Sequence, residues 1–191
     1  MKVQQGTAGY ISAKKRQLAV IIGAAAVIVI GLLVAGYMMY GSRLNWLTVV
    51  AVLICLPVCR TIVNLIMLIP YTSLSEKTEM EISGKTENLT VLYDLVITSE
   101  KKAMKIDAIV ISRNVVCGYS KSTKLDTDYA AKHIKSILEQ NGIEKVTVKI
   151  FKDYVAFLSR AEGMQSIASV EKNEPGRREK EIEQLILDIS L

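Results

Sequence analysis

The sequence predicts two membrane-spanning helices followed by a small α+β domain. Three observations lead to this fold class. Two long apolar runs lie near the N-terminus, every acidic residue lies after residue 71, and the later part of the chain alternates strand-like and helix-like segments. The roughly 100 ordered residues expected in that later part are enough for one modest hydrophobic core.

The first apolar run covers residues 17–40 and contains no charged residue. As a helix it would be about 36 Å long, which exceeds the roughly 30 Å hydrocarbon core of a bilayer. It is also longer than the apolar part of a signal peptide, so we expect an uncleaved anchor. Small residues recur four positions apart, a spacing that lets this helix pack closely on the second helix or on another subunit. They are Ala19, Gly23, Gly31 and Ala35.

The second apolar run covers residues 46–70 and follows a short link, residues 41–45. We therefore expect two antiparallel spans, a helical hairpin. Arg60 and Asn64 interrupt the run one helical turn apart, and residues 1–71 contain no acid that could pair with Arg60. One interpretation is that Arg60 extends its long side chain to the lipid headgroups. The other is that Arg60 and Asn64 contact a partner's membrane helix or an anionic lipid.

The distribution of charge argues against a nucleic-acid partner. The chain has a net charge of +5, but residues 1–71 hold six of the 24 cations and no acid. The remaining 18 cations face all 19 acids, a net charge of −1, so the domain has no general attraction for phosphate backbones. Three cations, 14–16, precede the first span, whereas the link has only Arg43. The positive-inside rule then predicts that residues 1–16 and the C-terminal domain are both cytoplasmic.

Four segments of the domain have the composition or alternation of strands. The first three are rich in β-branched and aromatic residues, and Arg113 with Asn114 forms a tight turn between the second and the third. A connector, residues 71–88, precedes them. The predicted strands are 89–98, 105–112, 115–120 and 145–151.

Three helices are expected between and after these strands. Asp126 or Thr127 caps the first, which ends at Asn141 and Gly142. The second covers 153–161 with an irregular continuation toward Val170, and the third is an amphipathic helix over 178–189. The predicted order over residues 89–191 is βββαβαα.

The domain has few groups suited to catalysis. His133 is the only histidine, and Cys117 is the only cysteine after the membrane part. A zinc site needs about four His, Cys or carboxylate ligands, so we expect no metal and no cofactor. A Ser–His or Cys–His nucleophile is not expected either, because no orienting acid lies at motif spacing to His133.

Asp107 lies in a predicted strand, and a turn, a second strand, a helix and a further strand follow it. Residues 89–151 thus resemble the core of the restriction-endonuclease-like superfamily, particularly its membrane-linked NERD-type members. In that family an aspartate on one strand and a Glu-x-Lys motif on the next hold a divalent ion. The resemblance places the aspartate at Asp107 and the motif near Ser120, Lys121 and Ser122, where no carboxylate occurs. It implies a related fold with an incomplete metal site, for which Asp94 is the remaining candidate ligand.

We therefore expect a membrane-anchored protein whose cytoplasmic domain is non-catalytic and acts in interaction or assembly at the membrane. Two alternatives stay open. One is a metal-dependent nuclease or phosphodiesterase that uses Asp107 and Asp94, and the other is an accessory subunit of a membrane transport complex that uses Arg60 and Asn64. The expected partners are the lipid bilayer and either a second copy of the chain or another membrane subunit.

Overall fold

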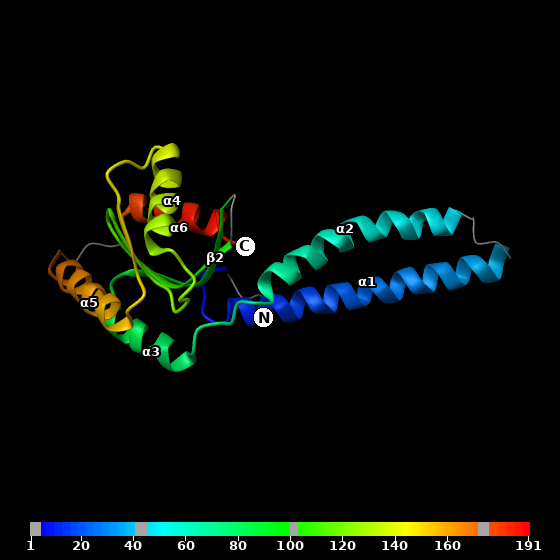
Figure 1. The fold of residues 1–191 in the computed structure, drawn as a ribbon, viewed down its shortest axis with the longest axis horizontal. Helices are drawn as coiled ribbons and strands as arrows, with labels where there is room; N and C mark the ends of the chain where they lie inside the picture. Colours follow the sequence, from blue (N-terminus) through cyan, green and yellow to red (C-terminus); the bar gives the residue numbers. More distant parts are fainter. Residues whose placement is uncertain (1–4, 41–45, 100–102, 172–175) are drawn as a thin grey trace. The chain divides into compact units, whose positions relative to one another are not determined.

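The computed structural model describes residues 5–40, 46–99, 103–171 and 176–191. These residues form two compact units (Figure 1). One unit is Ile11–Thr72, and the other combines the described residues up to Tyr10 with Ser73–Leu191. The described residues contain six helices and one four-stranded sheet, which confirms the predicted α+β class. The predicted link at residues 41–45 lies outside the described residues.

The first unit contains the two long apolar helices, α1 (Tyr10–Tyr40) and α2 (Trp46–Leu68). By length and composition both could cross a membrane. α1 begins at Tyr10, seven residues before the apolar run. Hydropathy marks the residues that tolerate lipid, whereas the helix begins where backbone hydrogen bonding begins, so the cations at 14–16 are part of the helix.

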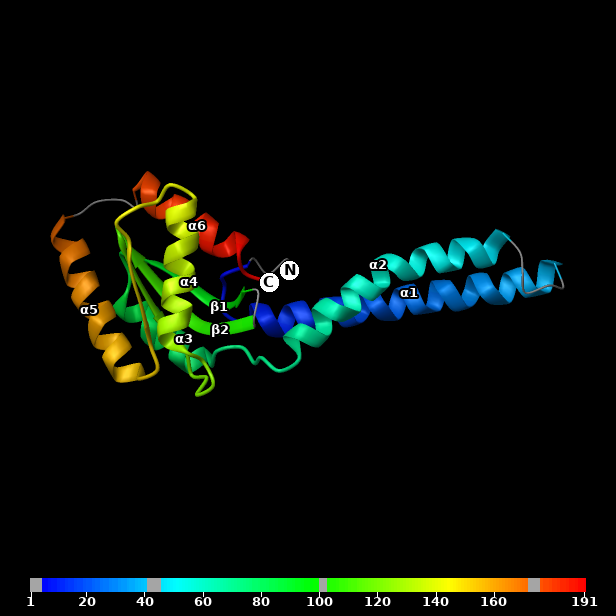
Figure 2. The ribbon, with the colours of Figure 1, turned by 45° about the horizontal axis from the view of Figure 1, so that its top comes forward.

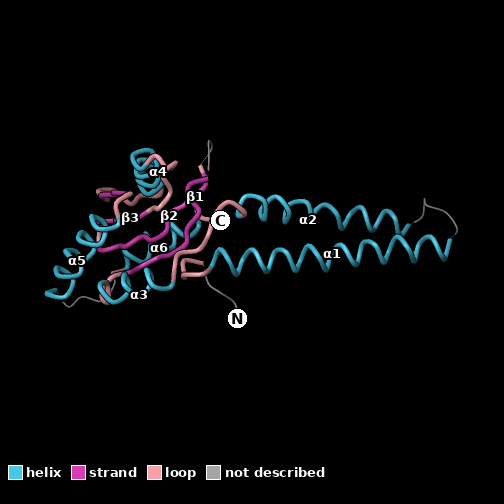
Figure 3. The backbone as a smooth tube through the Cα atoms, turned by 60° about the horizontal axis from the view of Figure 1, so that its bottom comes forward, coloured by secondary structure: helices cyan, strands magenta, loops and turns pink. Residues whose placement is uncertain are grey.

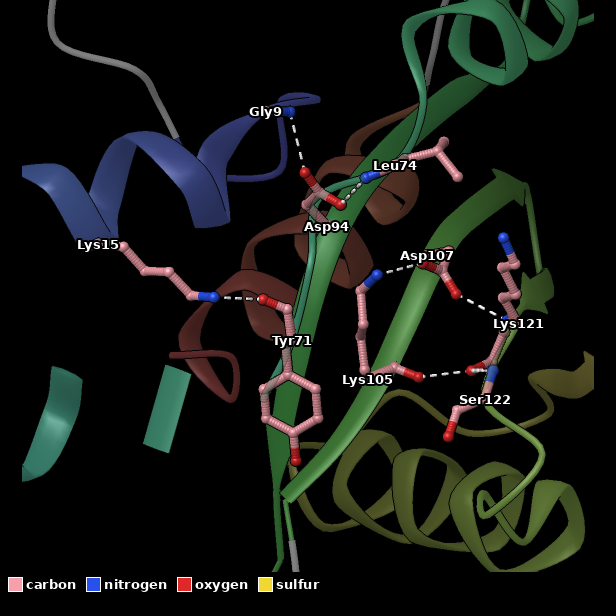
Figure 4. A network of polar contacts seen from close by, with 10 residues as sticks. Gly9, Lys15, Tyr71, Leu74, Asp94, Lys105, Asp107, Lys121 and Ser122 are labelled. Atoms are coloured by element: carbon pink, nitrogen blue, oxygen red, sulfur yellow. Dashed lines mark hydrogen bonds and ion pairs between the residues drawn. The ribbon is translucent and has the colours of Figure 1, made fainter. Parts of the chain in front are cut away.

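Lys15 stabilises the C-terminal end of α2. Its Nζ atom donates to the carbonyl oxygen of Ile69 at 2.9 Å and to that of Tyr71 at 2.6 Å; Figure 4 shows the contact with Tyr71. Both residues follow Leu68, the last residue of α2, and the C-terminal end of a helix carries partial negative charge, so an ammonium group beside it is favourable. This contact joins the N-terminal part of α1 to the chain that follows α2.

α1 and α2 lie side by side (Figures 1 and 3), and the pattern of exposure identifies the faces that meet. The less exposed positions of α1 beyond residue 17 are 18, 22, 25, 29, 32 and 36. On α2 a matching series of less exposed positions is 47, 51, 54, 58, 61, 65 and 68. Steps of three and four residues are the spacing of an antiparallel, coiled-coil-like seam. The hairpin therefore packs mainly through aliphatic residues, and Gly36 and Thr61 also lie on the seam.

The second unit is built on the sheet, whose strand order is β1-β2-β3-β4. β1 and β2 are antiparallel, β2 and β3 are antiparallel, and β3 and β4 are parallel. The parallel pair requires a crossover, which the helix between β3 and β4 provides. The strands are β1 (Thr90–Thr98), β2 (Ala103–Ser112), β3 (Val115–Tyr119) and β4 (Thr147–Phe151).

Helices cover both faces of the sheet (Figure 2). α4 (Thr127–Gln140) and α6 (Arg177–Asp188) supply buried residues to one core, and α3 (Glu76–Lys85) and α5 (Tyr154–Glu171) to the other. The first core centres on Ile109, Ile134 and Ile182, and the second on Ile82 and Phe157. The sheet is thus the middle of three layers.

Two helices add to the sequence expectation. α3 lies inside the predicted connector, whose pattern is compatible with either helix or strand, because its single fully buried residue, Ile82, gives little periodic signal. α5 continues regularly to Glu171, since Ala161 and Met164 extend its buried face. At α4 the expected cap is confirmed: Asp126 Oδ1 accepts the N–H groups of Asp128 and Tyr129, both at 3.1 Å.

The two ends of the chain close the outer edge of β1. The N–H of Tyr93 donates to the carbonyl of Gly6 at 2.7 Å, near the N-terminus. At the C-terminus, the N–H of Thr98 donates to Ile189 at 3.3 Å and the N–H of Leu191 donates to Val96 at 3.0 Å. These contacts pair backbone groups that an edge strand would otherwise expose.

β1 and β2 each change, halfway along the strand, which of their side chains point to the core beneath α4 and α6. Leu92 and Leu95 of β1 are three residues apart, yet both belong to the core beneath α4 and α6. Ile106 and Ile109 of β2 repeat this pattern. Regular alternation would put residues three apart on opposite faces, so each strand turns over between its two core residues. Asp94 and Asp107 lie within these two turnovers.

Candidate functional site

Asp94 joins three distant parts of the domain (Figure 4). Its Oδ1 accepts the N–H of Leu74 at 2.8 Å, and its Oδ2 accepts the N–H of Gly9 at 2.9 Å. Gly9 directly precedes α1, and Leu74 follows α2 after a short connection. The carboxylate therefore fastens β1 to the chain segments that adjoin both apolar helices.

Asp94 makes these contacts from a strained backbone conformation. Its φ of +53° lies in the left-handed region, which costs most non-glycine residues about 1–2 kcal/mol, although Asp tolerates it better than most. The side chain is only 1% exposed. Burial raises the pKa of Asp94, while hydrogen bonds from Leu74 and Ser73 and the positive charge of Lys105 act in the opposite direction. Such strain persists only where surrounding contacts hold it.

Asp107 lies on the neighbouring strand and also has partners for both carboxylate oxygens. Lys105 Nζ forms a buried ion pair with Oδ1, and the backbone N–H of Lys121 donates to Oδ2 at 2.7 Å. Asp107 is 3% exposed. Ser120 strengthens the same junction, because its hydroxyl donates to the carbonyl of Lys105 at 2.7 Å and accepts the N–H of Ser122 at 3.3 Å.

The segment 120–122, where the resemblance locates the Glu-x-Lys motif, therefore contacts β2 through one hydroxyl and one backbone N–H. Divalent ions such as magnesium prefer several oxygen ligands, usually including carboxylates. Among the described residues, no group of three or more His, Cys, Asp or Glu side chains is placed to hold a metal ion. The two aspartates here bind backbone N–H groups, the side chain of Ser73 and one ammonium group.

One feature of the sequence indicates part of this cluster. Lys105 and Asp107 are two residues apart in a strand, and this spacing puts an ammonium and a carboxylate on the same face. The contacts from Gly9 and Leu74 to Asp94 span 85 and 20 residues, and no local pattern indicates them.

The four small residues of α1, Ala19, Gly23, Gly31 and Ala35, are all exposed and lie off the seam with α2. No atom outside the helix's own backbone lies within 4 Å of a Cβ built on Gly23 or Gly31. Of the two partners left open by the sequence, α2 is therefore not the one that packs on them. Another subunit stays a prediction.

Arg60 and Asn64 lie on α2 as expected, one turn apart. Arg60 is exposed and Asn64 is partly exposed. At 100° per residue, Arg60 lies roughly opposite the seam formed by positions 58, 61 and 65. Arg60 therefore points away from α1 and toward the surroundings of the hairpin.

Four large apolar side chains of the domain are exposed on α3 and α5. Met80 of α3 is 69% exposed, and Val155, Ile167 and Val170 of α5 are 71%, 60% and 84% exposed. In the described part of the domain, every exposed large apolar side chain lies on these two helices. Exposed apolar side chains on these two helices are candidate contacts for a partner.

Comparisons of the chain with protein-family models, with curated proteins and with solved structures found no match.

Proposed function

We propose that the protein is an integral membrane protein with two spans and cytoplasmic termini, and that its domain is a non-catalytic module for interaction or assembly at the membrane. The observation that carries this proposal is the double contact of Asp94 with Gly9 and Leu74. All three residues belong to the unit that contains the sheet, so the domain itself holds the segments that lead into α1 and out of α2. Here a strained, buried carboxylate ties the sheet to the residues next to both spans.

The chemistry of the cluster supports a structural role. A catalytic carboxylate must reach a substrate or a metal, whereas Asp94 and Asp107 are almost fully buried and their oxygens accept protein donors. The exposed apolar side chains of α3 and α5 support the interaction role, because soluble helices normally direct polar residues toward water. Their partner is, in this proposal, a second copy or another membrane subunit.

Cysteine labelling tests the topology. In a Cys55→Ala/Cys59→Ala background, Ser42→Cys marks the link and Met80→Cys marks the domain. Cys117 is 1% exposed and serves as an internal negative control. A membrane-impermeant maleimide should label Ser42→Cys in intact cells and Met80→Cys only after lysis. The reverse pattern would invert the proposed orientation.

A charge on α5 tests the assembly role. The mass of the full-length protein in mild detergent is measured for the parent, for Val170→Glu and for Ser169→Glu, a neighbouring exposed position of the same helix. The proposal predicts a complex that Val170→Glu dissociates and Ser169→Glu preserves. A monomer of unchanged mass in all three, together with no co-purifying membrane subunit, would contradict it.

The exposed Arg60 favours a second candidate, an accessory role in a membrane transport complex. Because residues 1–71 hold no acid, a second copy cannot supply a carboxylate inside the membrane. A partner helix with an acid, or an anionic lipid, would pair with Arg60, and Asn64 would add a hydrogen bond. The hairpin should then co-purify with other membrane subunits, and Arg60→Leu should abolish this. Unchanged complex formation and lipid retention in Arg60→Leu would exclude the role.

The resemblance to the restriction-endonuclease-like fold leads us to treat the domain as a degenerate relative rather than an active nuclease. The test is incubation of the purified protein with magnesium or manganese and nucleic acid. Metal-dependent cleavage that Asp107→Ala abolishes, in a variant shown to be folded, would replace the non-catalytic proposal with the enzymatic one.

A further inference from the structure

The two edges of the sheet differ in whether other segments pair with them. The outer edge of β1 is closed by Gly6 at one end and by residues 189–191 at the other. β4 forms the opposite edge, and among the described residues β3 is the only strand that pairs with it. One edge is therefore available for another strand.

The hydrogen bonds between β3 and β4 show which backbone groups of β4 face outward. The N–H of Thr147 donates to Asn114 at 2.8 Å, and the carbonyl of Phe151 accepts from Ser120 at 3.0 Å. In a parallel pair the N–H and carbonyl of one residue point the same way, and the direction alternates along the strand. Thr147, Lys149 and Phe151 therefore face β3, and Val148 and Ile150 present their backbone groups at the open edge.

The side chains of β4 also alternate. Val148 and Ile150 belong to the apolar core under α4 and α6. Thr147 and Lys149 point to the opposite face and are exposed, and the Lys149 ammonium lies 5.0 Å from the centre of the Phe151 ring. A strand added here would meet aliphatic side chains on one face and a lysine on the other.

The charge along this edge selects the partner. Lys145, Lys149 and Lys152 are exposed at steps of three to four residues, and only Glu144 and Asp153, at the two ends, carry negative charge in this segment. A second copy paired antiparallel about Lys149 would place two lysines directly opposite each other, which is destabilising. An acidic strand would instead place a carboxylate there.

We propose that the open edge of β4 binds an extended segment of another protein as a fifth strand, and that this segment alternates aliphatic and acidic residues. The aliphatic residues lie beside Val148 and Ile150, and an acidic residue lies opposite Lys149. This binding mode gives affinity through the backbone and specificity through alternate side chains. The inference rests on the proposed interaction role of the domain and names the chemistry of one partner.

The test measures binding of a labelled peptide of alternating valine and glutamate to the full-length protein in detergent micelles by fluorescence anisotropy. Two further peptides serve as controls: one has lysine in place of glutamate, and one is N-methylated on the backbone edge that would pair. Lys149→Glu is the test variant. Lys77→Glu makes the same change of charge on α3, where the residue is also exposed.

The acidic peptide should bind, and both control peptides should bind at least about fivefold more weakly. Lys149→Glu should weaken the acidic peptide by about fivefold or more and reverse the preference toward the lysine peptide, while Lys77→Glu should not. Binding should slow hydrogen exchange at the Val148 and Ile150 amides. Absence of binding, insensitivity to N-methylation, or equal effects of the two variants would overturn the inference. None of these outcomes affects the labelling test of topology or the α5 test of assembly.

Discussion

Asp94 and Asp107 lie opposite each other in the antiparallel pair β1–β2. Between Thr90 and Thr98, Asp94 is the one residue of β1 that has no ladder partner on β2. Tyr93 pairs with Ala108 just before it and Leu95 pairs with Ile106 just after it, so the register is unchanged across the gap. Both strands turn over at this level. Two buried carboxylates therefore lie at one level of the sheet, with the ammonium of Lys105 as the nearby counter-charge.

The stabilisation from the two hydrogen bonds that Asp94 accepts can be separated from the cost of its backbone strain. Asp94→Gly keeps the left-handed conformation but removes both acceptors, and we expect a loss of about 2 kcal/mol in unfolding free energy. Asp94→Ala should lose about 1 kcal/mol more, because alanine is strained at positive φ. Asp94→Asn retains one oxygen and should fall between the parent and Asp94→Gly. Equilibrium unfolding of the full-length protein in micelles gives these values, and equal stability of the parent and Asp94→Gly would contradict the fastening.

The pKa of Asp94 predicts how stability depends on pH. Because burial raises this pKa above the ordinary value of 3.8, the folded protein keeps the proton to higher pH than the unfolded chain does. Unfolding free energy should therefore fall as pH rises from 3.8 to the raised value and then level off. The unfolding free energy of the parent minus that of Asp94→Asn, measured across this window, separates the effect of Asp94 from that of other carboxylates, and this difference should fall as pH rises. A difference that increases with pH would mean that the hydrogen bonds outweigh burial.

Removal of Lys105 should be more damaging than removal of the whole ion pair. Lys105→Met leaves Asp107 buried without its counter-charge, and breaking a buried pair in this way costs about 3–5 kcal/mol. In Lys105→Met/Asp107→Asn the charge is gone and the amide oxygen still accepts the N–H of Lys121, so the double variant should be more stable than Lys105→Met. Chemical unfolding of the two single variants and the double variant completes the cycle. A double variant less stable than Lys105→Met would refute this account.

The two faces of the hairpin should respond differently to larger side chains. Ala51 is 2% exposed and lies on the seam, so Ala51→Leu should destabilise the hairpin by about 1–3 kcal/mol. Gly23 is exposed off the seam, and Gly23→Leu should leave the monomeric hairpin unchanged. Trp46 is the only tryptophan, and its fluorescence during unfolding in micelles reports on the hairpin. Destabilisation by Gly23→Leu equal to that by Ala51→Leu would show that the small residues are packed.

Local patterns were enough to predict the long apolar helices, the strands and the cap of α4. Each depends on residues close together in the chain: an uncharged run, a stretch of β-branched residues, or Asp126 two and three residues before the N–H groups that it accepts. The candidate residues Asp94 and Asp107 were also found this way. The sequence did not show which face of the sheet these two carboxylates point to, because the strict alternation of side chains fails at this level of β1 and β2.

The sequence by itself thus determined the apolar helices, the near-neutral charge of the domain, its four strands and the presence of α4, α5 and α6, because these follow from composition and periodicity. Only the tertiary structure decided which face of α1 meets α2, which sheet edge the termini close, and that Asp94 holds Gly9 and Leu74. The physical reason is the same in each case. These features depend on which surfaces meet after the chain folds, and backbone N–H groups, which every residue except proline carries, leave no mark in a sequence.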